Sequence, residues 1–121
     1  KWCTTRGYAD IMIPQIYYGF ENSAAPYQST LDEWDALAKQ GGIPLIAGLS
    51  VSKVGCEDTW AGSGKYEWIN YSDIISRQAA AAKKCASYGG IALYSYRSVF
   101  QPESSVSKQV KKEITALRDI L

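Results

Sequence analysis

The chain has 121 residues, which is enough for one domain with a single core. Its apolar content of 46% is that of a globular protein, and its net charge is only +1, with both signs interspersed. The sequence has no basic stripe and no apolar run long enough to cross a bilayer. We therefore expect neither a nucleic-acid partner nor a membrane span.

Two residue counts narrow the chemistry further. The absence of histidine excludes Ser-His-Asp and Cys-His catalysis, as well as histidine-ligated metals, within the chain. The three cysteines (Cys3, Cys56 and Cys85) are widely spaced and odd in number, which fits neither a zinc ribbon nor a disulfide framework. We expect no cofactor, and any acid–base chemistry must use carboxylates, tyrosines, lysines or cysteines.

Apolar segments alternate with helical patterns along the whole chain. Lys1 opens it instead of Met, without a signal-peptide pattern, so we expect a mature form or a piece of a longer protein. Strands are predicted at 11–16, 43–51 and 91–96, and helices at about 31–40, 74–87 and 106–121. Expected helix caps are a Thr30–Glu33 capping box, the segment 71–73, and Ser104 or Ser105. The glycine pairs 41–42 and 89–90 are predicted to end the first two helices.

The β-α-β-α-β-α order predicts an α/β fold with three parallel βα units. Such a chain is either a small open sheet or a sector of a (β/α)8 barrel, a fold that takes roughly 250 residues when complete. Pro14 argues against a central strand position, because proline cannot donate to the ladder. It is expected where a ladder bond is missing or at a bulge.

Polar side chains gather where the first predicted strand ends. Gln15 and Tyr17 share one face of that strand, and Tyr18 and Glu21 follow it. In α/β proteins the carboxyl ends of strands carry the binding sites, so these residues are candidates for binding a substrate. The alternative is that Gln15 and Tyr17 serve the core. Glu21 is a candidate catalytic acid or nucleophile, or a solvated loop charge.

The later strand ends and the long loop 52–70 supply further candidates. Lys53 follows the second strand, where it could meet an anionic group or be solvated. Ser95 and Arg97 follow the third strand and could hydrogen-bond a ligand, or Arg97 could pair with a carboxylate at the barrel rim. Asp58, or its neighbour Glu57, is a possible second carboxylate, which glycoside hydrolysis normally requires. Four aromatic residues offer flat faces suited to sugar rings, with packing as the alternative use: Trp60, Trp68, Tyr94 and Tyr96. The glycine-rich stretch 62–65 fails the phosphate-loop pattern, so nucleotide binding is rejected.

Four stretches of the sequence carry a family resemblance. They are Y-A-D-I-M-I-P-Q-I-Y-Y-G-F-E-N, L-D-E-W, P-L-I-A-G-L-S-V-S-K-V-G and I-A-L-Y-S-Y. Together they resemble the C-terminal part of bacterial glycoside-hydrolase-like proteins, labelled family 10 glycosyl hydrolases or glycosyl-hydrolase-like 10. The resemblance implies that residues 1–121 are the C-terminal segment of a (β/α)8 barrel in an exported or cell-surface bacterial protein. It also implies that Gln15, Tyr17 and Lys53 are site positions, with Tyr18, Glu21 and Ser95 as weaker ones.

Three hypotheses follow from the sequence. In the first, the chain positions a polysaccharide for a glycoside hydrolase whose catalytic strands lie elsewhere, so the isolated chain is inactive. In the second, it is a non-catalytic carbohydrate-binding or cell-wall interaction domain. The third concerns assembly: exposed strand edges predict self-association, or contact with the missing part of the barrel.

Overall fold

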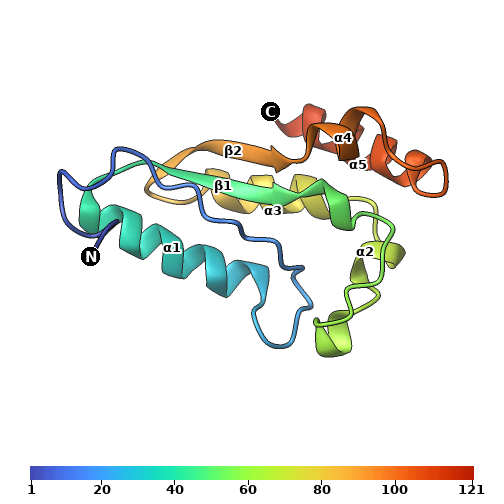
Figure 1. Ribbon diagram of the computed structural model, residues 1–121, viewed down its shortest axis with the longest axis horizontal. Coiled ribbons are helices and arrows are strands. Elements are labelled where there is room, and N and C mark those ends of the chain that lie inside the picture. The colour runs from blue at the N-terminus through green and yellow to red at the C-terminus, as the bar shows by residue number, and fades with distance from the viewer.

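A pair of parallel strands lies at the centre of the computed structural model, which describes residues 1–121. The strands are β1 (Leu45–Ser50) and β2 (Tyr88–Tyr94). Five α-helices accompany them: α1 (Tyr27–Gly41), α2 (Glu67–Asn70), α3 (Ile74–Lys83), α4 (Tyr96–Phe100) and α5 (Ser107–Ile120). Two short 3-10 turns, η1 (Val51–Lys53) and η2 (Gly62–Gly64), lie in the segment after β1. Figure 1 shows the strands running side by side along the molecule.

The predicted first strand does not form, and Pro14 is the reason. The segment 11–16 runs parallel to β1, but it makes only two isolated bridges, from Met12 to Leu45 and from Gln15 to Gly48. Backbone bonds join Met12 N to the Pro44 carbonyl at 3.0 Å and Gly48 N to the Pro14 carbonyl at 3.0 Å. Between them the ladder needs an N–H at position 14, which proline lacks. Pro14 therefore lies where a ladder bond is missing.

This interruption corrects the predicted fold class. Three parallel βα units of a partial (β/α)8 barrel are not formed, and the molecule is a small α/β domain with a two-stranded sheet. The parallel pairing predicted for the other two strands is present. In its register Ala47 lies opposite Ile91 and Leu49 opposite Leu93. The connection between β1 and β2 carries α3, as parallel pairing requires.

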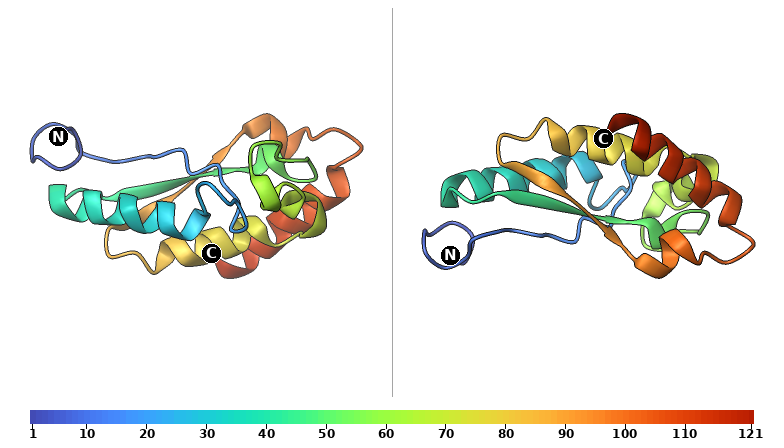
Figure 2. Two further views of the ribbon diagram at one scale, coloured as in Figure 1. Left: turned by 90° about the horizontal axis from the view of Figure 1, so that it is seen from below. Right: turned by 90° about the horizontal axis from the view of Figure 1, so that it is seen from above.

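The three longest helices lie on one side of the strands. Both panels of Figure 2 show α1, α3 and α5 together on that side. Helices α1 and α3 pack on β1, α3 also packs on β2, and α5 packs on α3. The core between them includes Ile16, Leu31, Leu49, Trp68 and Ile75, each no more than 1% exposed. The helical face therefore carries the apolar burial that holds the domain together.

The opposite side of the strands has no helical layer. The register places ten alternate residues on this side, which we call the open face: Ile11, Ile13, Gln15, Tyr17, Ile46, Gly48, Ser50, Gly90, Ala92 and Tyr94. Ile13 is 55% exposed and Tyr94 is 53% exposed. By contrast, Pro14 and Ile16 point from the same segment into the protein and are buried. None of these ten residues carries a charge.

Several predicted helix boundaries are wrong. Helix α1 starts at Tyr27, so Thr30 lies inside the helix, where its hydroxyl donates to the Pro26 carbonyl at 3.0 Å and forms no capping box. The glycines predicted to end the second helix, Gly89 and Gly90, lie within β2. Helix α5 begins at Ser107, after the predicted caps.

Two buried glutamates hold the backbone where local caps were expected. Glu113 of α5 accepts from Ile74 N at 3.0 Å and from Ile75 N at 2.9 Å, at the start of α3. It replaces the predicted cap Asp73, whose side chain makes no capping bond. Glu67 likewise accepts from Phe20 N and Glu21 N, both at 2.9 Å. The position of Glu113 at the N-terminus of α3 is favourable, because free N–H groups point outward there.

Candidate functional site

The carboxyl ends of the strands bring two tyrosines together on the open face. The Gln15–Gly48 bridge, extended by two residues, places Tyr17 beside Ser50, and Ser50 lies opposite Tyr94 in the sheet register. Ser50 is small, so the two rings meet above it with centroids 5.6 Å apart and an interplanar angle of 31°. Burial raises the pKa of the Tyr17 hydroxyl, and the neighbouring Tyr94 raises it further.

Gln15 completes this group, which we call the tyrosine platform: Gln15, Tyr17 and Tyr94. The Gln15 side chain lies on the same face, is exposed, and makes no hydrogen bond within the chain. Its amide therefore has both donors and acceptors free for a ligand. All three residues were candidates from the sequence, and the structure places the rings of Tyr17 and Tyr94 side by side.

Tyr18 and Glu21, which follow the platform in sequence, are placed differently. The Tyr18 carbonyl accepts from the buried Gln78 amide at 2.8 Å, and its ring is 37% exposed. The Glu21 backbone N–H is bound by Glu67, but its own carboxylate is exposed and makes no ion pair. This geometry is that of a solvated loop charge, and the neighbouring Glu67 carboxylate is occupied by the Phe20 and Glu21 N–H groups.

Lys53 and Asp58, predicted separately as site residues, bind each other. Their charged atoms lie 2.7 Å apart, and the Asp58 side chain is 7% exposed. A buried carboxylate with a cation at this distance is satisfied, and separating the pair would leave a charge without a partner. The pair therefore holds the loop after η1, and neither group is free to take a ligand.

The remaining predicted residues are scattered. Trp60 is 90% exposed, whereas Trp68 is buried in the core. The Ser95 hydroxyl caps α4 and accepts from Ser98 N at 3.4 Å. Tyr96 is 71% exposed, and its ring lies 4.7 Å from that of Phe100. None of these four residues takes part in the ring contact between Tyr17 and Tyr94.

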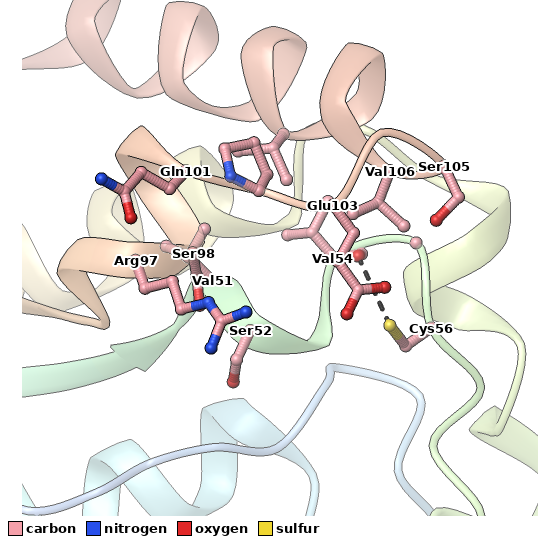
Figure 3. A pocket seen from close by; sticks show the side chains of 13 residues that line it. Val51, Ser52, Val54, Cys56, Arg97, Ser98, Gln101, Glu103, Ser105 and Val106 are labelled. Carbon is pink, nitrogen blue, oxygen red and sulfur yellow. Dashed lines mark hydrogen bonds between the residues drawn. The ribbon is translucent and has the colours of Figure 1, made fainter.

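A pocket that the sequence did not predict lies just beyond the ends of β1 and β2. Its volume is about 320 Å³, and its walls come from η1 and the following turn on one side and from α4 and the segment before α5 on the other. Figure 3 shows Arg97 and Glu103 extending their charged groups toward the same space. The sequence offered only one indication of this pocket, the possible ligand-binding role of Arg97. The pocket itself was not predictable, because its walls come from segments about 45 residues apart.

The three cysteines are free thiols, and burial raises the pKa of Cys85 to about 11, with Asp35 and Asp32 adding to the shift. No cluster of three or more histidine, cysteine or acidic side chains is arranged to hold a metal ion. None of the helices combines the length and apolar character needed to cross a membrane.

Comparison with known proteins adds no family to this geometry. No protein-family model matches the chain, and no curated protein matches it. The resemblance to glycoside-hydrolase-like proteins therefore stays a prediction from the sequence.

Proposed function

We propose that the chain binds carbohydrate on its open face, through the tyrosine platform. The observation that carries this proposal is the contact of Tyr17 with Tyr94 at the ends of the strands, beside the free amide of Gln15. Aromatic rings supply flat apolar surface, and a single polar group beside them fixes orientation, which is the usual composition of a ligand site. A sugar ring fits this combination, because it presents C–H groups on its faces and hydroxyls around its edge.

The acidic residues favour binding over hydrolysis. A glycosidase needs two carboxyl groups about 5–9.5 Å apart across the scissile bond. Asp58 is paired with Lys53, while Glu67 and Glu113 each accept two backbone N–H groups. Glu21 is exposed and forms no ion pair, and the carboxylate that contacts its backbone, Glu67, is occupied by two N–H groups. Hydrolysis by a longer protein containing this chain, at a bacterial surface, remains a prediction of the sequence resemblance.

A glycan array tests the proposal directly. The wild type should bind a subset of polysaccharides, and Tyr17→Ala should weaken that binding by about tenfold, because stacking on the ring is lost. Gln15→Ala should reduce the number of polysaccharides bound, or weaken binding to the same ones. Tyr71→Ala is the matched control, since Tyr71 is 43% exposed but lies away from the platform.

Two results would overturn these assignments. Equal glycan binding by the wild type and Tyr17→Ala would remove the platform from the site. Release of sugar products by the wild type that is abolished in Glu21→Gln would replace a binding role with a catalytic one.

The free edge of β2 supports a second proposal, that the chain pairs with a copy of itself. β2 has β1 on one side and no strand on the other. Its sequence, Y-G-G-I-A-L-Y, has no charge and no proline, which are the usual protections of an edge strand. A two-fold axis perpendicular to the sheet would pair the two β2 edges antiparallel. Both open faces would then lie on the same side, and the two tyrosine platforms would form one wider surface.

Light scattering at micromolar concentration tests the pairing. The wild type should be a dimer, and Ala92→Lys should shift it to monomer by placing like charges near the two-fold axis. Gln28→Lys adds the same charge on α1 and should leave the dimer intact. A monomeric wild type would contradict the proposal, and loss of the dimer in both variants would assign the effect to net charge.

A further inference from the structure

The pocket beyond the ends of β1 and β2 has an apolar floor and a charged rim. Its floor is formed by Val51, Val54 and Val110, which are at most 3% exposed. Arg97 and Glu103 stand on its rim, together with the hydroxyls of Ser52 and Ser105. The lining includes no aromatic residue. This composition differs from that of the tyrosine platform, so the pocket is suited to another class of ligand.

The two rim charges are unpaired. Arg97 and Glu103 form no ion pair with each other or with any other residue of the chain. They are the only charged residues that line this pocket. Figure 3 shows both charged groups directed into the space between α4 and the turn after η1. The nearby Lys53 and Asp58, by contrast, neutralise each other at 2.7 Å. A guanidinium and a carboxylate that line the same small pocket without a partner are complementary to a ligand that carries both signs.

We infer that this pocket binds a small zwitterion, with free apolar α-amino acids as the ligand class. The ligand carboxylate takes the Arg97 fork, which presents parallel N–H donors suited to a bidentate bond. The ammonium lies against Glu103, and the apolar side chain rests on the valine floor. The volume of about 320 Å³ is at the lower end of the range of about 300–1,000 Å³ for ligand pockets, so it suits a single amino acid.

Cys56 provides a reporter inside the same pocket. Its thiol is exposed, lines the wall opposite α4, and has only a weak 3.7 Å contact with the Val54 carbonyl. Cys3 and Cys85 are half-buried and lie outside the pocket lining. A ligand in the pocket therefore shields one cysteine of the three from an alkylating reagent.

The test uses L-leucine as the probe. Titration of the whole chain, followed by calorimetry and by amide chemical shifts, should give saturable binding with Kd of about 1 mM or tighter, as the small ligand size implies. Iodoacetamide labelling of Cys56, measured by peptide mass spectrometry, should slow in the same concentration range. N-acetyl-L-leucine lacks the ammonium and L-leucinamide lacks the carboxylate, so each should bind about tenfold more weakly.

Variants assign the two charges. Arg97→Gln should weaken L-leucine binding about tenfold and leave L-leucinamide binding unchanged, because the amide has no carboxylate to lose its partner. Glu103→Gln should also weaken L-leucine binding about tenfold, but it should leave N-acetyl-L-leucine binding unchanged. Arg118→Gln and Glu33→Gln are matched controls on exposed surfaces and should bind as the wild type does. No saturable binding by about 10 mM, equal binding of the blocked analogues, or unaltered affinity in both pocket variants would each overturn the inference.

Discussion

The two faces of the strands are both apolar in sequence, yet they have different roles. Ile16 points toward the helices and is fully buried, whereas Ile13, three residues earlier in the same segment, is 55% exposed on the open face. Burial of apolar surface stabilises the fold only on the helical face. The open face contributes little to stability, and the tyrosine platform lies on it.

Ile16→Ala should produce the largest effect. It removes a fully buried side chain from the core, and such truncations cost about 2–5 kcal/mol of unfolding free energy, because a cavity remains. Urea unfolding followed by circular dichroism measures the change. A loss below about 1 kcal/mol would mean that the helical face is not the main core.

Changing the pH should have the next largest effect, through Glu113. Burial raises the pKa of this carboxyl from 4.5 to about 7, more than its two backbone bonds lower it. Between these values the unfolded chain is ionised while the folded chain holds the proton, so unfolding becomes easier as the pH rises. The unfolding free energy should fall by roughly 3 kcal/mol from pH 4.5 to 7 and level off above that.

Glu113→Gln isolates that contribution, because glutamine does not titrate. Urea midpoints measured at pH 5 and pH 8 should differ less in this variant than in the wild type. Glu33→Gln, on an exposed surface, should keep the wild-type slope. Identical slopes in all three proteins would mean that another group governs the pH dependence.

Glu67→Gln should be milder than the core truncation. It replaces one of the two oxygens that hold the backbone of residues 20 and 21, and leaving a buried N–H without an acceptor costs about 1–3 kcal/mol. Amide hydrogen exchange should increase at those two positions before the rest of the domain responds. Unchanged exchange there would contradict the assigned role of Glu67.

Ile13→Ala completes the comparison with the smallest expected change. The side chain is more than half exposed, so its truncation should alter the unfolding free energy by less than about 1 kcal/mol. Together with Ile16→Ala it tests the two faces with the same residue type in the same segment. A large loss of unfolding free energy here would show that the open face is covered in solution at Ile13. The proposed dimer does not cover this position, because it pairs the molecules through β2.

Local patterns predicted the features that depend on neighbouring residues. The alternation of side chains placed Gln15 and Tyr17 on one face, and the apolar run at 43–51 contains β1. The Pro14 interruption was also visible in the sequence, but the prediction of three strands gave it too little weight. A proline in a parallel strand removes the one donor that the neighbouring carbonyl needs.

Features that join distant segments were not predictable from such patterns. Glu113 and Glu67 act on backbone groups 38 to 47 residues away, and nothing beside them in sequence indicates their partners. In the sequence Lys53 and Asp58 each resembled a free ligand-binding group, but in the structure the turn between them brings the two charges together. The capping box at Thr30 failed because packing of Tyr27 in the core extends α1 past it.

The Glu113 contact has a consequence for synthesis of the chain. Helix α3 leaves the ribosome roughly 30 residues before the glutamate that satisfies its first N–H groups, and translation adds only about 5–20 residues each second. During that interval α3 lacks its terminal acceptor, and its apolar face lacks α5. A nascent chain stalled before residue 113 should therefore remain protease-sensitive at residues 74–83, and release of the whole chain should protect them.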